Sequence, residues 1–306
     1  MTNTLPQHWM ISGASGLLGH TLCKQLASDG KTVSALKSTH NVGIEGVQEF
    51  FVDITDKSII QNNIKSLRPD VIVHAAGITN VDECEKNPSL AQAVHVDATR
   101  HIAEIAQSLQ IPLVYISTDH LWDGTQPMID EQVPTNPMNC YARTKRDGEL
   151  VALEICEQVL SIRTNFFGPG RPWRLSFSDW ILQNLAQGKP LNMFTDAYFT
   201  PISTWFLNRA LIELVNKKAS GIFNATGRER LSKYDFGLML ADATNYSRFL
   251  INKTSLSSFG LAAPRPRDMS LSTEKIATFL NHPMPTAKES IKSLNLSTQT
   301  PNQADV

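Results

Sequence analysis

A glycine-rich turn near the N-terminus constrains the fold of this chain more than any other feature. Gly13, Gly16 and Gly19 are spaced three residues apart, directly after the apolar run Trp9-Met10-Ile11. Small residues let the backbone turn tightly beside a pyrophosphate, and the N-terminus of the following helix supplies N–H donors to it. Such glycines could also serve only to pack a helix closely against a sheet. Their position between a strand and a helix favours a dinucleotide-binding turn.

Apolar runs and longer amphipathic stretches alternate through the first two thirds of the chain. Strands that alternate with helices of this length need right-handed crossovers and therefore form a parallel sheet. The predicted fold class is α/β, a Rossmann-type doubly wound parallel sheet with a smaller C-terminal α+β lobe. We expect strands at residues 9–11, 32–36, 50–54, 71–74, 112–117 and 160–163, and helices at 17–28, 57–67, 90–109 and 139–159.

The alternation loosens after about residue 166, where aromatic residues, prolines and glycines cluster. We therefore expect a dinucleotide-binding domain over residues 1–165, with a segment near 197–218 that returns to it. Residues 166–196 and 219–295 are predicted to form the smaller lobe, which binds the substrate. The polar residues 296–306 are predicted to form a disordered tail.

Composition argues against several classes of protein. The 306 residues carry a formal net charge of −1, so no nucleic acid polymer is expected as a partner. The four cysteines are scattered without a CxxC pair, which indicates free thiols rather than disulfides or a metal site. Residues 1–8 lack a signal-peptide pattern, and no apolar run reaches the roughly 18 to 20 residues that span a bilayer. We expect a cytoplasmic protein without a membrane partner.

The end of the second predicted strand bears on the choice of cofactor. An acidic residue there would accept hydrogen bonds from the ribose 2′-hydroxyl of NAD, but this chain has Lys37-Ser38-Thr39-His40. A lysine beside hydroxyl groups suits a 2′-phosphate, which favours NADP over NAD. The alternative is that Lys37 is a solvated surface lysine.

Two further strand ends are predicted to face the cofactor. Asp53 and Ile54 end the third strand, where Asp53 would hydrogen-bond the adenine or cap the helix that starts near Asp56. Ala75, Ala76 and Gly77 end the fourth strand. Their small side chains leave room for a ribose and a pyrophosphate, although close packing would explain them equally well.

A tyrosine and a lysine, Tyr141 and Lys145, are placed one turn apart on one face of a predicted helix. A free tyrosine has a pKa of about 10, and a neighbouring ammonium would stabilise the phenolate and lower that pKa. Tyr141 would donate a proton to a carbonyl oxygen as hydride reaches its carbon. Lys145 would also hold the ribose hydroxyls next to the nicotinamide. A lone YxxxK pattern is common on helices, but here Thr118, at the end of the preceding strand, would orient the same oxygen.

These motifs resemble the dTDP-4-dehydrorhamnose reductases, which are extended short-chain dehydrogenases. The resemblance implies an NADP-dependent oxidoreductase that transfers hydride to C4 of a nucleotide-linked 4-keto-6-deoxy sugar, as in dTDP-rhamnose biosynthesis for cell-envelope polysaccharide. Extended members often dimerise, so a homodimer is possible. The resemblance covers nearly the whole chain and rests on Val71–Gly77, Val81–Glu83, Ile116–Asp119, Leu121, Asp123-Gly124, Pro134–Pro137, Tyr141–Lys145, Arg163-Thr164, Pro201, Arg265–Asp268 and Leu271.

The resemblance also implies roles for individual residues. The glycine-rich turn would hold the cofactor through Gly13, Ser15, Gly16, Leu17, Leu18 and Gly19. A planar arginine is suited to a nucleotide diphosphate, which would be the role of Arg265 and Arg267. No metal is implied. The remaining substrate-binding residues would be Thr118, Asp119 and His120 at the strand end, and Phe166 or Phe167 beside the sugar ring.

The chain departs from the family pattern next to the predicted sugar site. His120 stands where tyrosine is usual, and Leu121-Trp122 replaces valine-phenylalanine, which leaves the hexose open. Two other functions also stay open. One is a sugar-nucleotide epimerase that uses the same hydride chemistry reversibly. The other is a non-catalytic NADP-binding module, because the chain also resembles the regulatory β subunit of methionine adenosyltransferase.

Overall fold

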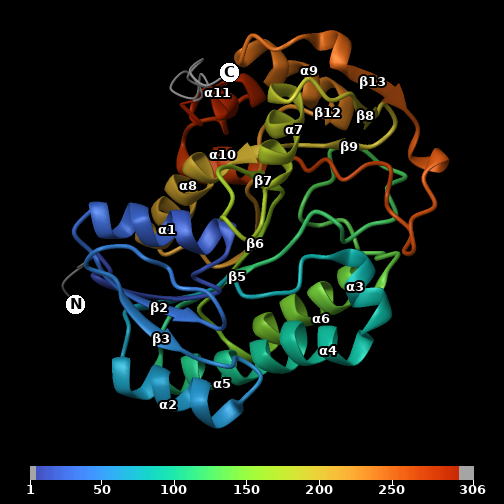
Figure 1. Ribbon diagram of the computed structural model, residues 1–306. Coiled ribbons are helices and arrows are strands. Elements are labelled where there is room, and N and C mark those ends of the chain that lie inside the picture. The colour runs from blue at the N-terminus through green and yellow to red at the C-terminus, as the bar shows by residue number, and fades with distance from the viewer. Residues whose placement is uncertain (1–4, 296–306) are drawn as a thin grey trace.

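A seven-stranded parallel sheet forms the centre of this computed structural model, which describes residues 5–295 (Figure 1). The strand order is β3-β2-β1-β4-β5-β6-β11. The chain reverses direction across the sheet between β1 and β4, so their carboxyl ends flank the crevice where ligands bind in such folds. The predicted doubly wound α/β fold is confirmed. The strands are β1 (His8–Ser12), β2 (Thr32–Lys37), β3 (Gln48–Phe51), β4 (Val71–His74), β5 (Leu113–Ile116), β6 (Val159–Arg163) and β11 (Gly221–Asn224).

Helices cover both faces of the sheet, as Figure 1 shows. Because successive strand residues face opposite sides, Trp9 and Ile11 pack in one apolar cluster and Met10 packs in the other. The first cluster lies under α1 and α8, and the second lies under α2, α5 and α6. These helices are α1 (Leu17–Ser28), α2 (Lys57–Leu67), α5 (Ala98–Leu109), α6 (Cys140–Ile155) and α8 (Thr204–Asn216).

The connection from β4 to β5 differs from the single helix predicted over residues 90–109. It consists of α3 (Val81–Lys86), α4 (Pro88–Gln92), the π-helical turn η1 (Ala93–Asp97) and then α5. Within η1 the ring of His95 is buried, and its Nε2 accepts a hydrogen bond from the N–H of Ile78 at 3.0 Å. The π-helical turn thus ties this connection to the residues that follow β4.

Helix α6 carries the predicted Tyr-Lys pair and begins as expected. The side chain of Asn139 caps it by accepting a hydrogen bond from the N–H of Ala142 at 2.9 Å. The predicted end at Val159 is wrong, because the backbone becomes extended at Cys156 and Val159 already starts β6.

The smaller lobe packs around its own apolar cluster, in which the rings of Phe167 and Phe236 lie 4.9 Å apart. It contains three short strand pairs: β7 (Phe166–Phe167) with β10 (Ile202–Ser203), β9 (Tyr198–Phe199) with β12 (Leu231–Ser232), and β8 (Leu191–Phe194) with β13 (Ile251–Thr254). Its helices are α7 (Phe177–Ala186), α9 (Lys233–Ala243), η2 (Arg248–Leu250), η3 (Leu256–Ser258) and α11 (Ala287–Lys292). Helix α10 (Glu274–Leu280) instead packs against β11, and its Ile276 and Leu280 join the first apolar cluster of the main sheet.

The last strand of the main sheet, β11, corrects the predicted boundary between the two lobes. Residues 219–295 were expected in the smaller lobe, but β11 pairs with β6 in parallel along its whole length. The segment expected to return near 197–218 contains α8, which lies against α1 (Figure 1). The predicted tail, 296–306, and the first four residues of the chain lie outside the described residues. No helix in residues 5–295 is long and apolar enough to cross a membrane.

Candidate active site

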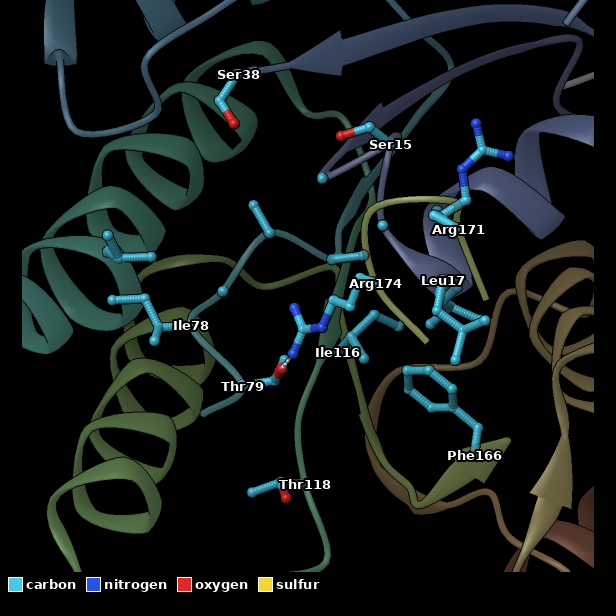
Figure 2. Close-up of a pocket in the computed structure, with 18 of the residues that line it drawn as sticks. Ser15, Leu17, Ser38, Ile78, Thr79, Ile116, Thr118, Phe166, Arg171 and Arg174 are labelled. Atoms are coloured by element: carbon cyan, nitrogen blue, oxygen red, sulfur yellow. Dashed lines mark hydrogen bonds between the residues drawn. The ribbon is translucent and has the colours of Figure 1, made fainter. Parts of the chain in front are cut away.

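A cavity of about 1020 Å³ opens at the carboxyl ends of the strands and extends to the smaller lobe (Figure 2). In Figure 2, Ser15 and Ser38 lie at one end, Thr118 lies at the other, and Arg174 lies between them. The residues expected to bind cofactor and substrate meet here, with two exceptions considered below. The lining includes Gly13, Ser15, Gly16, Leu17, Leu18, Gly19, Lys37, Asp53, Ile54, Ala75, Ala76, Gly77, Thr118, Asp119, His120, Tyr141, Lys145, Phe166 and Phe167.

The glycine-rich turn serves both close packing and ligand access. Gly13 has a φ of +69°, and a Cβ there would stand 2.7 Å from the backbone of Ala76. A Cβ on Gly19 would stand 2.3 Å from the carbonyl oxygen of Gly13. Helix α1 then begins at the cavity with Gly16 as N-cap, without a side-chain cap and without an acidic residue in its first turn. Its first N–H groups are therefore available to an anion, and the site fits the pyrophosphate of a dinucleotide.

The end of β2 places Lys37 in the lining, but with its charge already balanced. The ammonium lies 2.8 Å from the carboxylate of Glu49 and also donates to the side chain of Asn41. Glu49 accepts two more hydrogen bonds, from the N–H groups of Val42 and Gly43, which help to lower its pKa. Lys37 is thus part of a structural ion pair at the edge of the cavity.

Asp53 lies in the cavity lining after β3, and the capping alternative for it is wrong. Its carboxylate accepts from the N–H and the hydroxyl of Thr55, at 2.9 and 2.7 Å. The cap of α2 is Asp56, which accepts from the N–H groups of Ser58 and Ile59. Asp53 therefore shapes the turn that brings it to the cavity.

The phenol of Tyr141 is held in its protonated form. Burial raises its pKa to about 12, although a hydrogen bond with the side chain of Thr118 acts in the opposite direction. The ring is fixed by edge contacts with the rings of His120, at 5.6 Å, and His95, at 5.8 Å. Both Tyr141 on α6 and Thr118 at the end of β5 line the cavity.

Lys145 lies deeper than its partner on the helix. Its Nζ donates to the carbonyl of Ile116 at 2.7 Å and lies 4.2 Å from the ring centroid of Tyr115. Burial lowers its pKa to about 7. The expectation that Lys145 lowers the pKa of Tyr141 is not met, because burial dominates both groups and moves the two pKa values in the directions that favour their neutral forms.

Asp119 is the centre of a polar group at the far end of the cavity. Its carboxylate accepts from the amide of Asn165 at 2.6 Å and from the hydroxyl of Thr118 at 3.4 Å. The ring of His120 lies 3.9 Å away. Burial raises the pKa of Asp119 and lowers that of His120. The arrangement offers both donors and acceptors to a polar ligand.

Lys233 completes this polar group and was not found from the sequence. Its Nζ lies 3.3 Å from the ring centroid of Phe199 and 4.9 Å from that of Phe177. Burial lowers its pKa to about 8, against the opposing effect of Asp119. A lysine in the first turn of a helix opposes the helix dipole, and its position directly after the N-cap Ser232 is a signal that could have singled it out.

The two arginines expected at the nucleotide diphosphate, Arg265 and Arg267, are not part of the cavity lining. Arg265 forms an ion pair with Asp82 at 3.0 Å and donates to the carbonyl of Ala263. Two other arginines, Arg171 and Arg174, line the cavity instead (Figure 2). Both belong to the Pro/Gly-rich stretch after β7. The sequence there has no regular periodicity, so it predicts neither a helix or strand nor the position of these side chains.

The fold and the site define a Rossmann-type oxidoreductase framework with an attached substrate lobe. The family model described as RmlD substrate binding domain matches residues 7–299, and the chain belongs to that family. A dTDP-4-dehydrorhamnose reductase of Streptomyces griseus is 29% identical over 85% of this chain and 83% of its own length. Methionine adenosyltransferase 2 subunit beta of Bos taurus is also 29% identical, over 88% of this chain and 81% of its own length.

Solved structures show the same architecture. The dTDP-4-dehydrorhamnose reductase of Bacillus anthracis, crystallised in complex with NADP, superposes with a TM-score of 0.85. The match covers 96% of this chain and all of that one, at 24% sequence identity. At that identity the likeness establishes the fold, including the pairing of sheet and lobe, rather than the activity.

Proposed function

We propose that this protein is an NADPH-dependent reductase of a nucleotide-linked 4-keto-6-deoxy sugar, similar to dTDP-4-dehydrorhamnose reductase. The observation that carries the proposal is the convergence of Tyr141 and Lys145 on α6 with Thr118 at the end of β5, in the cavity that the glycine-rich turn opens. The similarity to the dTDP-4-dehydrorhamnose reductase of Streptomyces griseus supports a nucleotide-linked keto sugar as the class of substrate. NADP is the cofactor in the complex of the Bacillus anthracis structure.

The residues at the reacting centre suit proton donation. When bound, the reduced nicotinamide supplies the hydride that reaches the keto carbon. With a pKa of about 12, the phenol of Tyr141 holds its proton at neutral pH and can donate it to the developing oxyanion. Thr118, whose side chain lies close enough to that phenol to lower its pKa, would orient the same oxygen. Lys145 provides a donor beside Tyr141 for the cofactor ribose and anchors α6 to β5 through the carbonyl of Ile116.

The polar group around Asp119 is suited to a sugar ring. Its carboxylate accepts hydrogen bonds from sugar hydroxyls, while Lys233 and Asn165 donate to them. Apolar sugar faces pack well on aromatic rings, and Phe199 and Phe177, whose rings lie against Lys233, both line the cavity. Under this proposal, hydride transfer takes place beside Tyr141 and Thr118, and the neighbouring group around Asp119 binds the hydroxyls of the sugar.

The test is a panel of nucleotide-linked 4-keto sugars with NADPH, followed by absorbance and by analysis of the sugar product. We expect stoichiometric NADPH consumption and a 4-hydroxy sugar with at least one substrate. Interconversion of sugars without net cofactor consumption would identify an epimerase instead. Tight NADPH binding without turnover on any member of the panel would favour a regulatory module like the methionine adenosyltransferase relative.

A further inference from the structure

A short loop of the smaller lobe lies against the cofactor half of the cavity. We call residues Gly170–Leu175, between β7 and α7, the arginine loop. Its base is closed because the N–H groups of Gly170 and Ser176 both donate to the carboxylate of Asp179, at 2.6 and 3.1 Å. Arg171 and Arg174 also exchange two backbone hydrogen bonds, at 2.9 and 2.8 Å. The loop therefore has a defined shape, and it presents arginine side chains to a cavity that belongs mainly to the other lobe.

The arginine loop bridges the two walls of the cavity. Arg174 donates to the hydroxyl of Thr79, which follows β4, and Figure 2 shows this bond across the middle of the site. On the other wall, the ring of Trp173 stacks on His40, with centroids 4.1 Å apart and an interplanar angle of 15°. His40 belongs to the segment after β2, where dinucleotide-binding sheets hold the adenosine ribose.

Arg171 is held at that same wall. Its guanidinium carbon lies 4.7 Å from the ring centroid of Trp173, and its Nη2 donates to the carbonyl of Val42 at 3.3 Å. Figure 2 draws it on the side of the cavity where Ser15 and Leu17 of the glycine-rich turn lie. Arg171 thus stands among residues that approach the adenosine half of a dinucleotide.

The charge of Arg171 lacks a counter-ion. Among residues 5–295 no carboxylate forms an ion pair with it, and its buried Nε has no hydrogen-bond partner. The guanidinium is only partly buried, so an anionic ligand could reach it and supply the missing counter-charge through charge-assisted hydrogen bonds. Lys37, the cation expected to recognise a 2′-phosphate, is already paired with Glu49 at 2.8 Å. Of the two cations, Arg171 is the one with donors free for a ligand.

We propose that Arg171, rather than Lys37, recognises the 2′-phosphate of NADP. The proposal rests on the proposed function only in taking a nicotinamide dinucleotide as the ligand. An arginine near the adenosine ribose accommodates a 2′-phosphate in such folds, and its planar donors match phosphate oxygens in pairs. The preference for NADP over NAD is therefore set by a residue of the substrate lobe, which Trp173 and Val42 hold in position.

The test measures binding of NADPH, NADH, 2′,5′-ADP and ADP by calorimetry, with no sugar present. Arg171→Met should raise the Kd for NADPH and for 2′,5′-ADP by about 10- to 100-fold, the usual effect of losing a charge-assisted hydrogen bond. The Kd values for NADH and ADP should change by less than about threefold, because these ligands lack the 2′-phosphate. Arg209→Met is the matched control, since its guanidinium also stacks on a tryptophan, Trp205, at 4.5 Å but lies outside the cavity lining.

Two further variants separate recognition from folding. Lys37→Met should keep most of the preference for binding NADPH over NADH. Trp173→Ala should lose part of that preference while its Kd for NADH stays unchanged. If Arg171→Met lost affinity for NADPH and NADH equally, Arg171 would be assigned to the pyrophosphate or to the fold, and the proposal would be overturned. Loss of the preference in Lys37→Met alone would overturn it as well. Selective NADPH loss in Arg171→Met without turnover of any keto sugar would support this inference while refuting the proposed reductase.

Discussion

A Cβ atom on Gly148 would stand only 2.2 Å from the backbone carbonyl oxygen of His95. Helix α6 and the π-helical turn η1 thus meet backbone to backbone. Side chains reinforce the contact, because His95 Nδ1 and Thr144 Oγ1 lie 2.8 Å apart. Tyr141 and Lys145 stand on the same helix, so this contact helps to set the depth of both residues in the cavity.

Replacing Gly148 with alanine should therefore damage both stability and activity. The added methyl group would also lie 2.7 Å from the hydroxyl of Tyr115, so neither neighbour can yield without moving an element. We expect a loss of about 1 to 3 kcal/mol in the free energy of unfolding, typical of overpacking, measured by urea titration. Gly260→Ala is the control, since a Cβ there meets open space. Unchanged stability in Gly148→Ala would show that α6 is not held by this contact.

Tyr141→Phe should remove the proton donor and leave the cofactor site intact. We expect kcat for the reduction to fall by about 10²-fold or more, the scale of losing a general acid, with an unchanged Kd for NADPH. Stopped-flow absorbance and calorimetry give the two quantities. Tyr234→Phe, on α9 and outside the cavity lining, should behave like the parent protein. Full turnover in Tyr141→Phe would assign the proton to another group.

Lys233→Met should affect the sugar and not the cofactor. The ammonium lies against the rings of Phe199 and Phe177, with Asp119 as its nearby charge. We expect KM for the keto sugar nucleotide to rise by about 10-fold or more, as for loss of a hydrogen bond from a charged donor, with a smaller change in kcat. Lys233→Arg should recover part of the affinity. A selective rise in Kd for NADPH instead would place Lys233 at the cofactor.

Acid should destabilise the fold through its buried histidines. His74 is held between Ser12 Oγ, at 2.7 Å, and Thr99 Oγ1, at 3.1 Å, and burial lowers its pKa to about 3. The pKa of His95 is also lowered to about 3, again mainly by burial. Because these values lie below the roughly 6.5 of an unfolded histidine, the unfolded chain binds more protons between pH 3 and 6.5. Stability is therefore complete above about pH 6.5 and is lost as the pH falls through this window.

The expected slope is about 1.4 kcal/mol per pH unit for each of these histidines inside the window. Urea unfolding at pH 7.5, 6 and 5 measures it. His74→Gln keeps polar groups toward Ser12 and Thr99 but cannot titrate, so it should be less stable at pH 7.5 and show a shallower slope. An identical slope in His74→Gln would mean that other groups drive acid unfolding.

Local patterns predicted many of the residues that line the cavity on the side of the glycine-rich turn. The glycine turn, the strand ends at Asp53 and Gly77, and the pair Tyr141 and Lys145 all line the cavity, because parallel strands bring their carboxyl ends together whatever the exact lengths of the elements. The π-helical turn η1 was not predictable, because its register depends on contacts of His95 with distant residues.

The substrate half was harder to predict, because its residues come from segments without regular periodicity. Lys233 and Arg171 reach the cavity only through the tertiary arrangement of the smaller lobe. Arg265 was expected there from the resemblance to the reductase family, but it forms an ion pair with Asp82 and does not line the cavity. The pKa of Tyr141 was predicted with the wrong sign, because helical spacing says nothing about burial and burial outweighs a neighbouring cation here.

The order of strands in the main sheet also determines how the protein can be divided. Since β11 borders β6 and α8 covers part of the same face as α1, a fragment that stops at residue 165 would leave β6 as a bare edge and uncover leucines beneath α8. Exposed edges of this kind pair with other chains, so such a fragment should aggregate on expression. Complementation by two separately expressed halves would require a break after residue 224 or inside an external loop of the lobe.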